Sequence, residues 1–131
     1  MPKHNTLLGF DFGMRRIGVA VGQMITRTAN PVAVLNARDG VPNWEHVQEL
    51  IDTWNIDAIV VGIPLNMDGS KQPVTFAAQR FANKLSSRYG LPVYTVDERL
   101  TTLEAKRHQQ KELDSYAAKL ILEQWLREQD S

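Results

Sequence analysis

Residues 7–12 read Leu-Leu-Gly-Phe-Asp-Phe, a short apolar run that carries a carboxylate near its end. A tight turn is expected over residues 13–16, and the strand pattern resumes over residues 17–22. A third apolar run covers residues 31–35. Three strands joined by such short connections predict an antiparallel meander at the start of the chain.

From residue 44 onward, the spacing of apolar residues predicts helices that alternate with strands. Apolar residues at 44, 47, 50, 51 and 54 fall on one helix face. Residues 58–63 are apolar and mostly β-branched, as in a parallel sheet that is covered on both faces. The remaining expected elements are a helix with apolar residues from 74 to 85 that Gly90 ends, a strand over 91–96, a polar helix over 101–110 and a last helix over about 114–128.

This order, βββαβαβαα, predicts one α/β domain that spans residues 1–131. Strand–helix–strand crossovers require parallel pairing. The expected architecture is therefore a mixed five-stranded sheet, with a three-stranded antiparallel meander plus two parallel strands, flanked by helices. In such sheets, function gathers at the carboxyl ends of the parallel strands.

The composition sets few limits on function. Fifteen basic and fifteen acidic residues give a net charge of zero, which counts mildly against a nucleic-acid-binding protein, although a local basic patch is enough to hold phosphates. The sequence has no cysteine, which excludes disulfides and thiolate metal sites and suits a reducing compartment. No apolar run reaches the length of a membrane span. We therefore expect a cytoplasmic protein with no membrane partner.

Several carboxylates fall where this fold would bring them together. Asp11 ends the first strand, Asp97 and Glu98 end the last one, and Asp114 begins the final helix. Converging carboxylates repel one another unless a cation neutralises them. Mg²⁺ takes oxygen ligands, commonly one or two carboxylates together with substrate phosphates. The pattern therefore predicts a divalent-metal site suited to phosphodiester hydrolysis.

Each of these carboxylates also has a simpler interpretation. Asp11 could shape the turn that follows it. Asp114 could be only the N-cap of its helix, a position that favours aspartate. Residues 97–99 could be a solvated charge cluster.

A long polar loop follows the strand over residues 58–63. Gly69 and Ser70 suit the close approach of a phosphate, and the next helix could present free N–H groups to an anion. The loop lacks the Gly-Lys-Ser/Thr ending of a P-loop, and a plain strand-to-helix connection is the alternative. The expected nucleic-acid contacts are Arg15, Arg16, Asn66, Ser70, Arg99, Lys106 and Arg107.

Five blocks of the sequence resemble the YqgF/RuvX family, in order and over nearly the whole chain. They are FDFG at 10–13, IGVAVG at 17–22, VGIPLNMDG at 61–69, DERLTT at 97–102 and DSYAA at 114–118. The resemblance implies an RNase H-like fold related to the Holliday junction resolvase RuvC. It also implies a nuclease that acts either in 5′-end maturation of pre-16S ribosomal RNA or on Holliday junctions.

The resemblance further implies which carboxylates are catalytic and bind the metal. These are Asp11, one acid of the 97–98 pair and Asp114, with Mg²⁺ or Mn²⁺ as the cofactor. Between the neighbours we favour Glu98, because adjacent side chains of an extended strand point to opposite faces, and Asp97 stays open as a ligand.

Three functions remain open at this point. Processing of pre-rRNA, with ribosomal particles among the partners, is favoured. Cutting of branched DNA usually calls for a symmetric dimer, and the zero net charge and the lack of an obvious dimer seam weaken that case. The third is a non-catalytic nucleic-acid-binding or ribosome-associated module, and both a monomer and a homodimer are compatible with the sequence.

One departure from the family lies next to the predicted site. Family members carry a longer, glycine-containing stretch between the Asp-Glu-Arg block and the final acidic helix, whereas only residues 100–113 intervene here. We expect either a short loop or residues missing between Arg107 and Leu113. The substrate contacts of this segment stay open for that reason.

Overall fold

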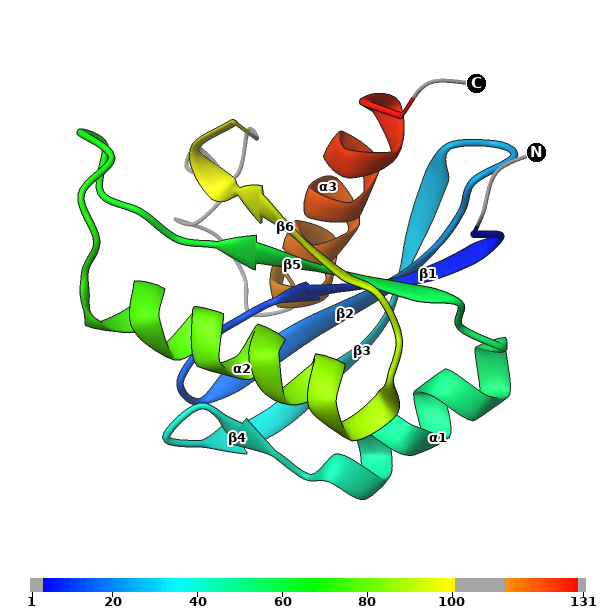
Figure 1. Ribbon diagram of the computed structural model, residues 1–131, viewed down its shortest axis with the longest axis horizontal. Coiled ribbons are helices and arrows are strands. Elements are labelled where there is room, and N and C mark those ends of the chain that lie inside the picture. Colours follow the sequence, from blue (N-terminus) through cyan, green and yellow to red (C-terminus); the bar gives the residue numbers. More distant parts are fainter. Residues whose placement is uncertain (1–3, 101–112, 130–131) are drawn as a thin grey trace.

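The computed structural model describes residues 4–100 and 113–129, which form one mixed six-stranded sheet with helices on both faces (Figure 1). The strands are β1 (Thr6–Asp11), β2 (Arg16–Gln23), β3 (Thr28–Arg38), β4 (Val41–Pro42), β5 (Ala58–Ile63) and β6 (Val93–Asp97). The helices are α1 (Trp44–Trp54), α2 (Pro73–Tyr89), the 3-10 helix η1 (Glu98–Leu100) and α3 (Leu113–Arg127). The helix expected over residues 101–110 lies outside the described residues.

The strands pair in the predicted way. The sheet order is β4-β3-β2-β1-β5-β6, with β1, β2 and β3 antiparallel to one another in turn and β1, β5 and β6 parallel. The α/β class, the meander and the two added parallel strands are therefore confirmed. Because β1 lies between β2 and β5, Asp11 has Gly18 as its partner on one side and Gly62 on the other.

The predicted number of five strands is wrong, because a sixth strand follows β3. Asp39 and Gly40 both have positive φ, at 51° and 81°, as in a two-residue type I′ hairpin turn. This turn folds Val41 and Pro42 back onto the end of β3. A two-residue strand is too short to show an alternating apolar pattern, so the hairpin signal of Asp39-Gly40 is the one indication of it in the sequence.

The sheet separates two apolar cores. Helices α1 and α2 cover one face (Figure 1). On that face Phe10 and Phe81 meet edge to face with their ring centroids 5.3 Å apart. Helix α3 covers the other face, where Leu7 and Ile121 are fully buried. Side chains alternate along a strand, so Asp11 shares the face of Leu7 and lies on the α3 side.

Helix α2 begins next to the carboxyl end of β5. The backbone N–H of Gln72 donates to Thr75 Oγ1 over 3.0 Å, and the buried Thr75 hydroxyl donates to the carbonyl of Pro64. These bonds tie the base of the loop over residues 64–72 to the helix. The helix ends at Gly90, whose φ of 65° is the left-handed conformation expected of a C-terminal glycine.

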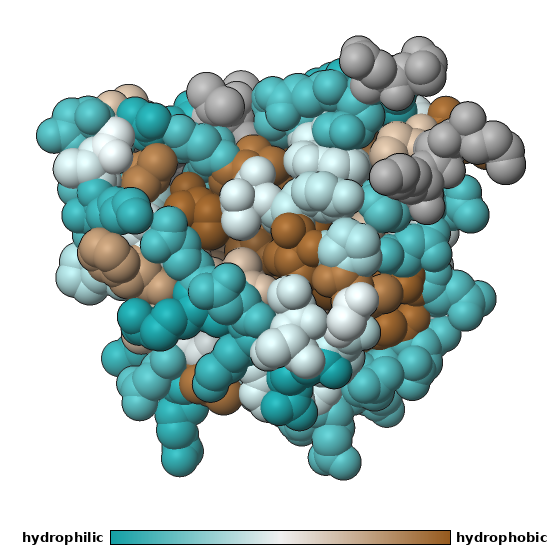
Figure 2. Space-filling view, in the orientation of Figure 1, coloured by the Kyte–Doolittle hydropathy of each residue, from teal (hydrophilic) through white to brown (hydrophobic). Residues whose placement is uncertain are grey.

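The surface on the side of α2 is mainly hydrophilic. Apolar side chains show between the hydrophilic ones across the middle of this view (Figure 2). Among the helices of the described ranges, 4–100 and 113–129, none is long and apolar enough to cross a membrane.

Candidate active site at the carboxyl edge of the sheet

Asp11 is the central carboxylate of the site. It is the last residue of β1 and only 5% exposed, and among the described residues Asp11 and Thr75 are the two buried polar ones. Both of its cross-strand partners, Gly18 and Gly62, are glycines. Because neither glycine has a side chain, there is space on both sides of Asp11 on the α3 face, and Glu98 and the start of α3 occupy it.

Glu98 occupies the room over Gly62. A Cβ atom built on Gly62 would lie 3.0 Å from Glu98 Oε1, an oxygen that is buried. Strand β6 ends at Asp97, and the 3-10 helix that follows directs Glu98 back over the neighbouring strand. Because neighbouring strands lie about 5 Å apart, this places the Glu98 carboxylate beside Asp11.

The start of α3 occupies the room over Gly18. A Cβ atom built on Gly18 would lie 2.8 Å from the backbone nitrogen of Ser115 and would overlap the carbonyl group of Asp114. The helix backbone therefore rests directly on β2 at this point. This contact fixes the position of Asp114, in the first turn of α3, relative to Asp11.

The Asp114 side chain pairs with Arg16. Arg16 Nε lies 2.9 Å from Asp114 Oδ2, and the two side chains are 48% and 28% exposed. Asp114 Oδ2 is buried and makes no hydrogen bond with any described residue, so this contact is an ion pair without good hydrogen-bond alignment. Arg16, which was expected to contact nucleic acid, therefore lies at the edge of the site and is paired with Asp114, one of the catalytic candidates.

The three candidates gather at one edge without forming a closed set of ligands. Within the part of the chain that the structure describes, no three acidic or histidine side chains converge closely enough to hold one metal ion. Glu98, from η1, lies over Gly62, the β5 partner of Asp11, whereas the Asp114 side chain is turned toward Arg16.

Asp97 faces a different partner. Arg99 Nε donates to both carboxylate oxygens of Asp97 at 3.1 Å, and Arg99 Nη2 donates to Oδ2 at 2.6 Å. These hydrogen bonds hold the pKa of Asp97 below its usual value. Arg99, another expected nucleic-acid contact, also donates from Nη1 to the carbonyl of Met67 at 3.2 Å.

The other expected nucleic-acid contacts are distributed around this edge. Asn66 Nδ2 donates to Ser70 Oγ at 2.9 Å, and Ser70 donates from its hydroxyl and its backbone N–H to Asp68. Those bonds from Ser70 lower the pKa of Asp68. Arg15 is exposed in the turn between β1 and β2. Lys106 and Arg107 lie outside the described residues.

The two glycines are the functional positions that sequence reasoning missed. Gly18 and Gly62 interrupt apolar strands, and a strand glycine often marks the close approach of another group. Their pairing with Asp11 could not be read from the sequence, because it depends on the register of both neighbouring strands.

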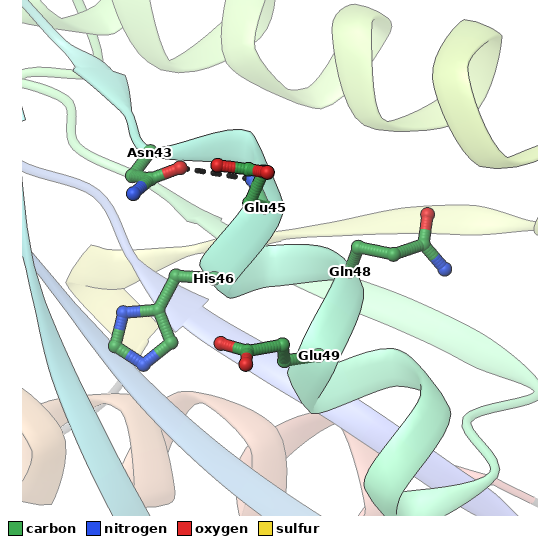
Figure 3. Close-up of a pocket in the computed structure, with 5 residues that line it drawn as sticks. All are labelled: Asn43, Glu45, His46, Gln48 and Glu49. Carbon is green, nitrogen blue, oxygen red and sulfur yellow. Dashed lines mark hydrogen bonds between the residues drawn. The ribbon is translucent and has the colours of Figure 1, made fainter.

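A surface hollow elsewhere does not belong to this site. It has a volume of about 500 Å³ and is lined by Asn43, Glu45, His46, Gln48 and Glu49, at the start of α1 (Figure 3). The side chain of Asn43 caps this helix by accepting from the backbone N–H of Glu45. Since α1 and α3 cover opposite faces of the sheet, the hollow and Asp11 lie on opposite sides.

Solved structures share this architecture. The chain matches Thermus thermophilus RuvC in complex with a Holliday junction substrate with a TM-score of 0.59 and 15% identity, over 94% of both chains. It matches the fowlpox virus resolvase in complex with Holliday junction DNA with a TM-score of 0.54 and 12% identity, over 93% of this chain and 97% of the other. These likenesses show the RNase H-like fold.

Sequence comparisons are more specific. A family model described as "RuvX: Holliday junction resolvase" matches residues 5–128. A relative from Coxiella burnetii named "Putative pre-16S rRNA nuclease" is 61% identical over 98% of both chains, and one of the same name from Azotobacter vinelandii is 51% identical over 93% of both. The Coxiella alignment spans 138 positions against 131 residues here, so that relative carries residues that this chain lacks.

The fold and the family define a nuclease, a hydrolase that acts on the phosphodiester bonds of nucleic acid. Within that class, the chain belongs to the RuvX family. The predicted resemblance to this family and the predicted RNase H-like fold are thereby confirmed.

Proposed function

We propose that this chain is a metal-dependent nuclease in which Asp11 and Glu98 hold Mg²⁺ or Mn²⁺ and Asp114 completes the carboxylate set. The observation that carries the proposal is the pair of glycines beside Asp11. They admit the Glu98 carboxylate on one side and the first turn of α3 on the other.

The donor set fits a hard divalent cation. Asp11 is buried, as is Glu98 Oε1, and carboxylate oxygens are the ligands that a hard divalent cation takes in proteins. Two carboxylates are enough for Mg²⁺, which commonly takes its other ligands from water and from substrate phosphates. When bound, the cation would polarise the phosphoryl oxygen and stabilise the charge that develops on it.

The protein's own residues orient the substrate around this centre. Arg16 lies at the site edge within reach of a phosphate, and its ion pair places it beside Asp114. Arg15 is exposed on the same turn. We assign both arginines to phosphate contacts, which supply affinity but no sequence preference.

We propose the 5′ end of pre-16S rRNA as the substrate. Support comes from relatives 46–61% identical over nearly their whole length that carry this function in their names. The proposal includes a cytoplasmic, single-domain enzyme that meets its substrate on ribosomal particles. The family's description favours a second candidate, a Holliday junction, which would require a homodimer rather than a monomer.

A direct comparison of substrates tests this choice. Purified protein is given either a pre-16S fragment with its 5′ extension or a four-way DNA junction, each with Mn²⁺ and each with EDTA. We expect Mn²⁺-dependent cleavage of the RNA at least about tenfold faster than that of the junction, a difference of about 1.4 kcal/mol in activation free energy. Faster, paired cuts in the junction by a dimer would establish the second candidate instead.

The glycine beside Glu98 provides a further prediction. A Cβ atom on Gly62 would meet the end of the Ile121 side chain and Glu98 Oε1, both of which can move. We expect Gly62→Ala to lower kcat about 10- to 100-fold, because it displaces a metal-binding carboxylate. The free energy of unfolding should fall by no more than about 1–2 kcal/mol, as for a mild overpacking. Urea unfolding and steady-state kinetics on the same preparation check both values, and an unchanged kcat would contradict the placement of Glu98.

A further inference from the structure

The loop over residues 64–72 runs along the same edge as the carboxylates. It leaves β5 one residue after Gly62, the partner of Asp11, and enters α2 at Pro73. The base of the loop is held by the bond from Thr75 to the carbonyl of Pro64. Its tip is a compact turn in which Asn66 N donates to Ser70 O at 3.0 Å and Gly69 N donates to Asn66 O at 2.8 Å.

Arg99 joins this tip to the end of β6. Its Nη1 donates to the carbonyl of Met67, while its Nε and Nη2 donate to Asp97. The backbone N–H of Arg99 also donates to Asp97 Oδ1 at 2.9 Å. The planar guanidinium can bind Asp97 and the Met67 carbonyl at the same time, because its donors point in fixed directions.

The tip of the loop is shaped to receive the guanidinium. Gly69 has a φ of 88°, and a Cβ atom on it would lie 3.2 Å from Arg99 Nη1. Met67, whose carbonyl accepts the bond, is 71% exposed. The Met67 side chain therefore does not anchor the tip, and the contact there depends on the loop backbone and on Arg99.

We propose that Asp97 and Arg99 form a latch that holds the tip of the 64–72 loop at the catalytic edge, so that Asp97 is a positioning residue and not a metal ligand. Asp97 orients Arg99, and Arg99 fixes Met67. The loop then presents its polar groups to the substrate at a constant distance from Asp11 and Glu98. This inference deepens the proposed function and rests on it for the catalytic consequence only.

Hydrogen exchange tests the latch without any need for activity. The variants are Arg99→Ala, Asp97→Asn and the double variant, with Arg127→Ala as the matched control, because Arg127 is an exposed arginine at the far end of α3. We expect the amides of Asn66, Gly69 and Ser70 to exchange about three- to tenfold faster in both single variants, consistent with loss of partly exposed charged hydrogen bonds. The double variant should add little, because both changes open the same latch.

Kinetics separate positioning from metal binding. Both single variants should raise KM for the nucleic acid about three- to tenfold, with kcat and the Mn²⁺ concentration for half-maximal rate unchanged. Arg99→Lys should recover part of the loss, because lysine can pair with Asp97 but cannot also reach Met67 with the same fork.

Two results would overturn the latch. One is unchanged exchange over residues 66–70 in Arg99→Ala. The other is a raised Mn²⁺ requirement in Asp97→Asn that Arg99→Ala does not share, which would make Asp97 a metal ligand. If the unmodified protein cleaves nothing with any divalent metal, the proposed function fails, while the exchange result still decides whether the latch exists.

Discussion

Replacing Asp11 with asparagine is expected to abolish cleavage and leave the fold intact. Asparagine has nearly the same shape, but it removes the negative charge at the centre of the carboxylate edge. Loss of several kcal/mol of metal-assisted charge stabilisation corresponds to a fall in kcat of at least about 10³-fold. The free energy of unfolding of the metal-free protein should be unchanged or should rise, because one charge leaves a group of like charges.

The matched control for this variant is Asp52→Asn. Asp52 is an exposed carboxylate on α1, on the opposite face of the sheet, and its side chain accepts a bond from Gln48. It should keep full activity when prepared in parallel. Cleavage by Asp11→Asn at a rate close to that of Asp52→Asn would remove Asp11 from the catalytic centre.

Replacing Gly18 with alanine is expected to produce the largest loss of stability. The new Cβ atom would overlap the carbonyl of Asp114, and backbone in the first turn of a packed helix cannot move aside as a side chain can. Overpacking costs about 1–3 kcal/mol and occasionally more. We expect a loss of about 3 kcal/mol in the free energy of unfolding, together with lower activity, because the start of α3 must shift.

Gly22→Ala is the matched control for Gly18→Ala, since both residues belong to β2. The atoms nearest to a Cβ atom on Gly22 would be side-chain atoms of Leu122 and Leu126, at 2.8 Å and 3.0 Å. The free energy of unfolding of Gly22→Ala should fall by about 1 kcal/mol, because the intrinsic advantage of alanine over glycine in a strand offsets part of the cost of overpacking. Equal losses of stability in the two variants, measured by urea unfolding, would contradict the direct contact of α3 with Gly18.

The centre of the parallel part of the sheet was predictable because β5 is buried along its whole length, whereas β6 at the edge of the sheet is mostly half-buried. Residues 58–63 are apolar at every position, and β5 has those bounds. The same reasoning placed Asp11 at the edge where function was expected, since the carboxyl ends of parallel strands share one edge. The short strand β4 escaped this reasoning, because two residues cannot show a period.

Side-chain partners across the site were not predictable in the same way. The sequence suggested Arg16 and Arg99 as phosphate contacts but not their acidic partners, which in the structure are Asp114 and Asp97. The Arg16–Asp114 pair joins residues that only the fold brings together. The Arg99–Asp97 pair depends on the turn where β6 ends. The sequence favoured Glu98 over Asp97 because side chains alternate along a strand. In the structure Glu98 lies over Gly62 for a different reason: β6 ends at Asp97, and a 3-10 helix directs Glu98 back over β5.

Anomalous scattering from crystals soaked in Mn²⁺ would show whether the carboxylates at this edge hold a divalent cation. We expect a manganese peak at bonding distance from oxygens of Asp11 and Glu98, which Asp11→Asn crystals lack and Asp52→Asn crystals keep. Saturating Mn²⁺ that leaves this edge without a peak, in crystals of protein that cleaves nucleic acid with Mn²⁺ in solution, would contradict it.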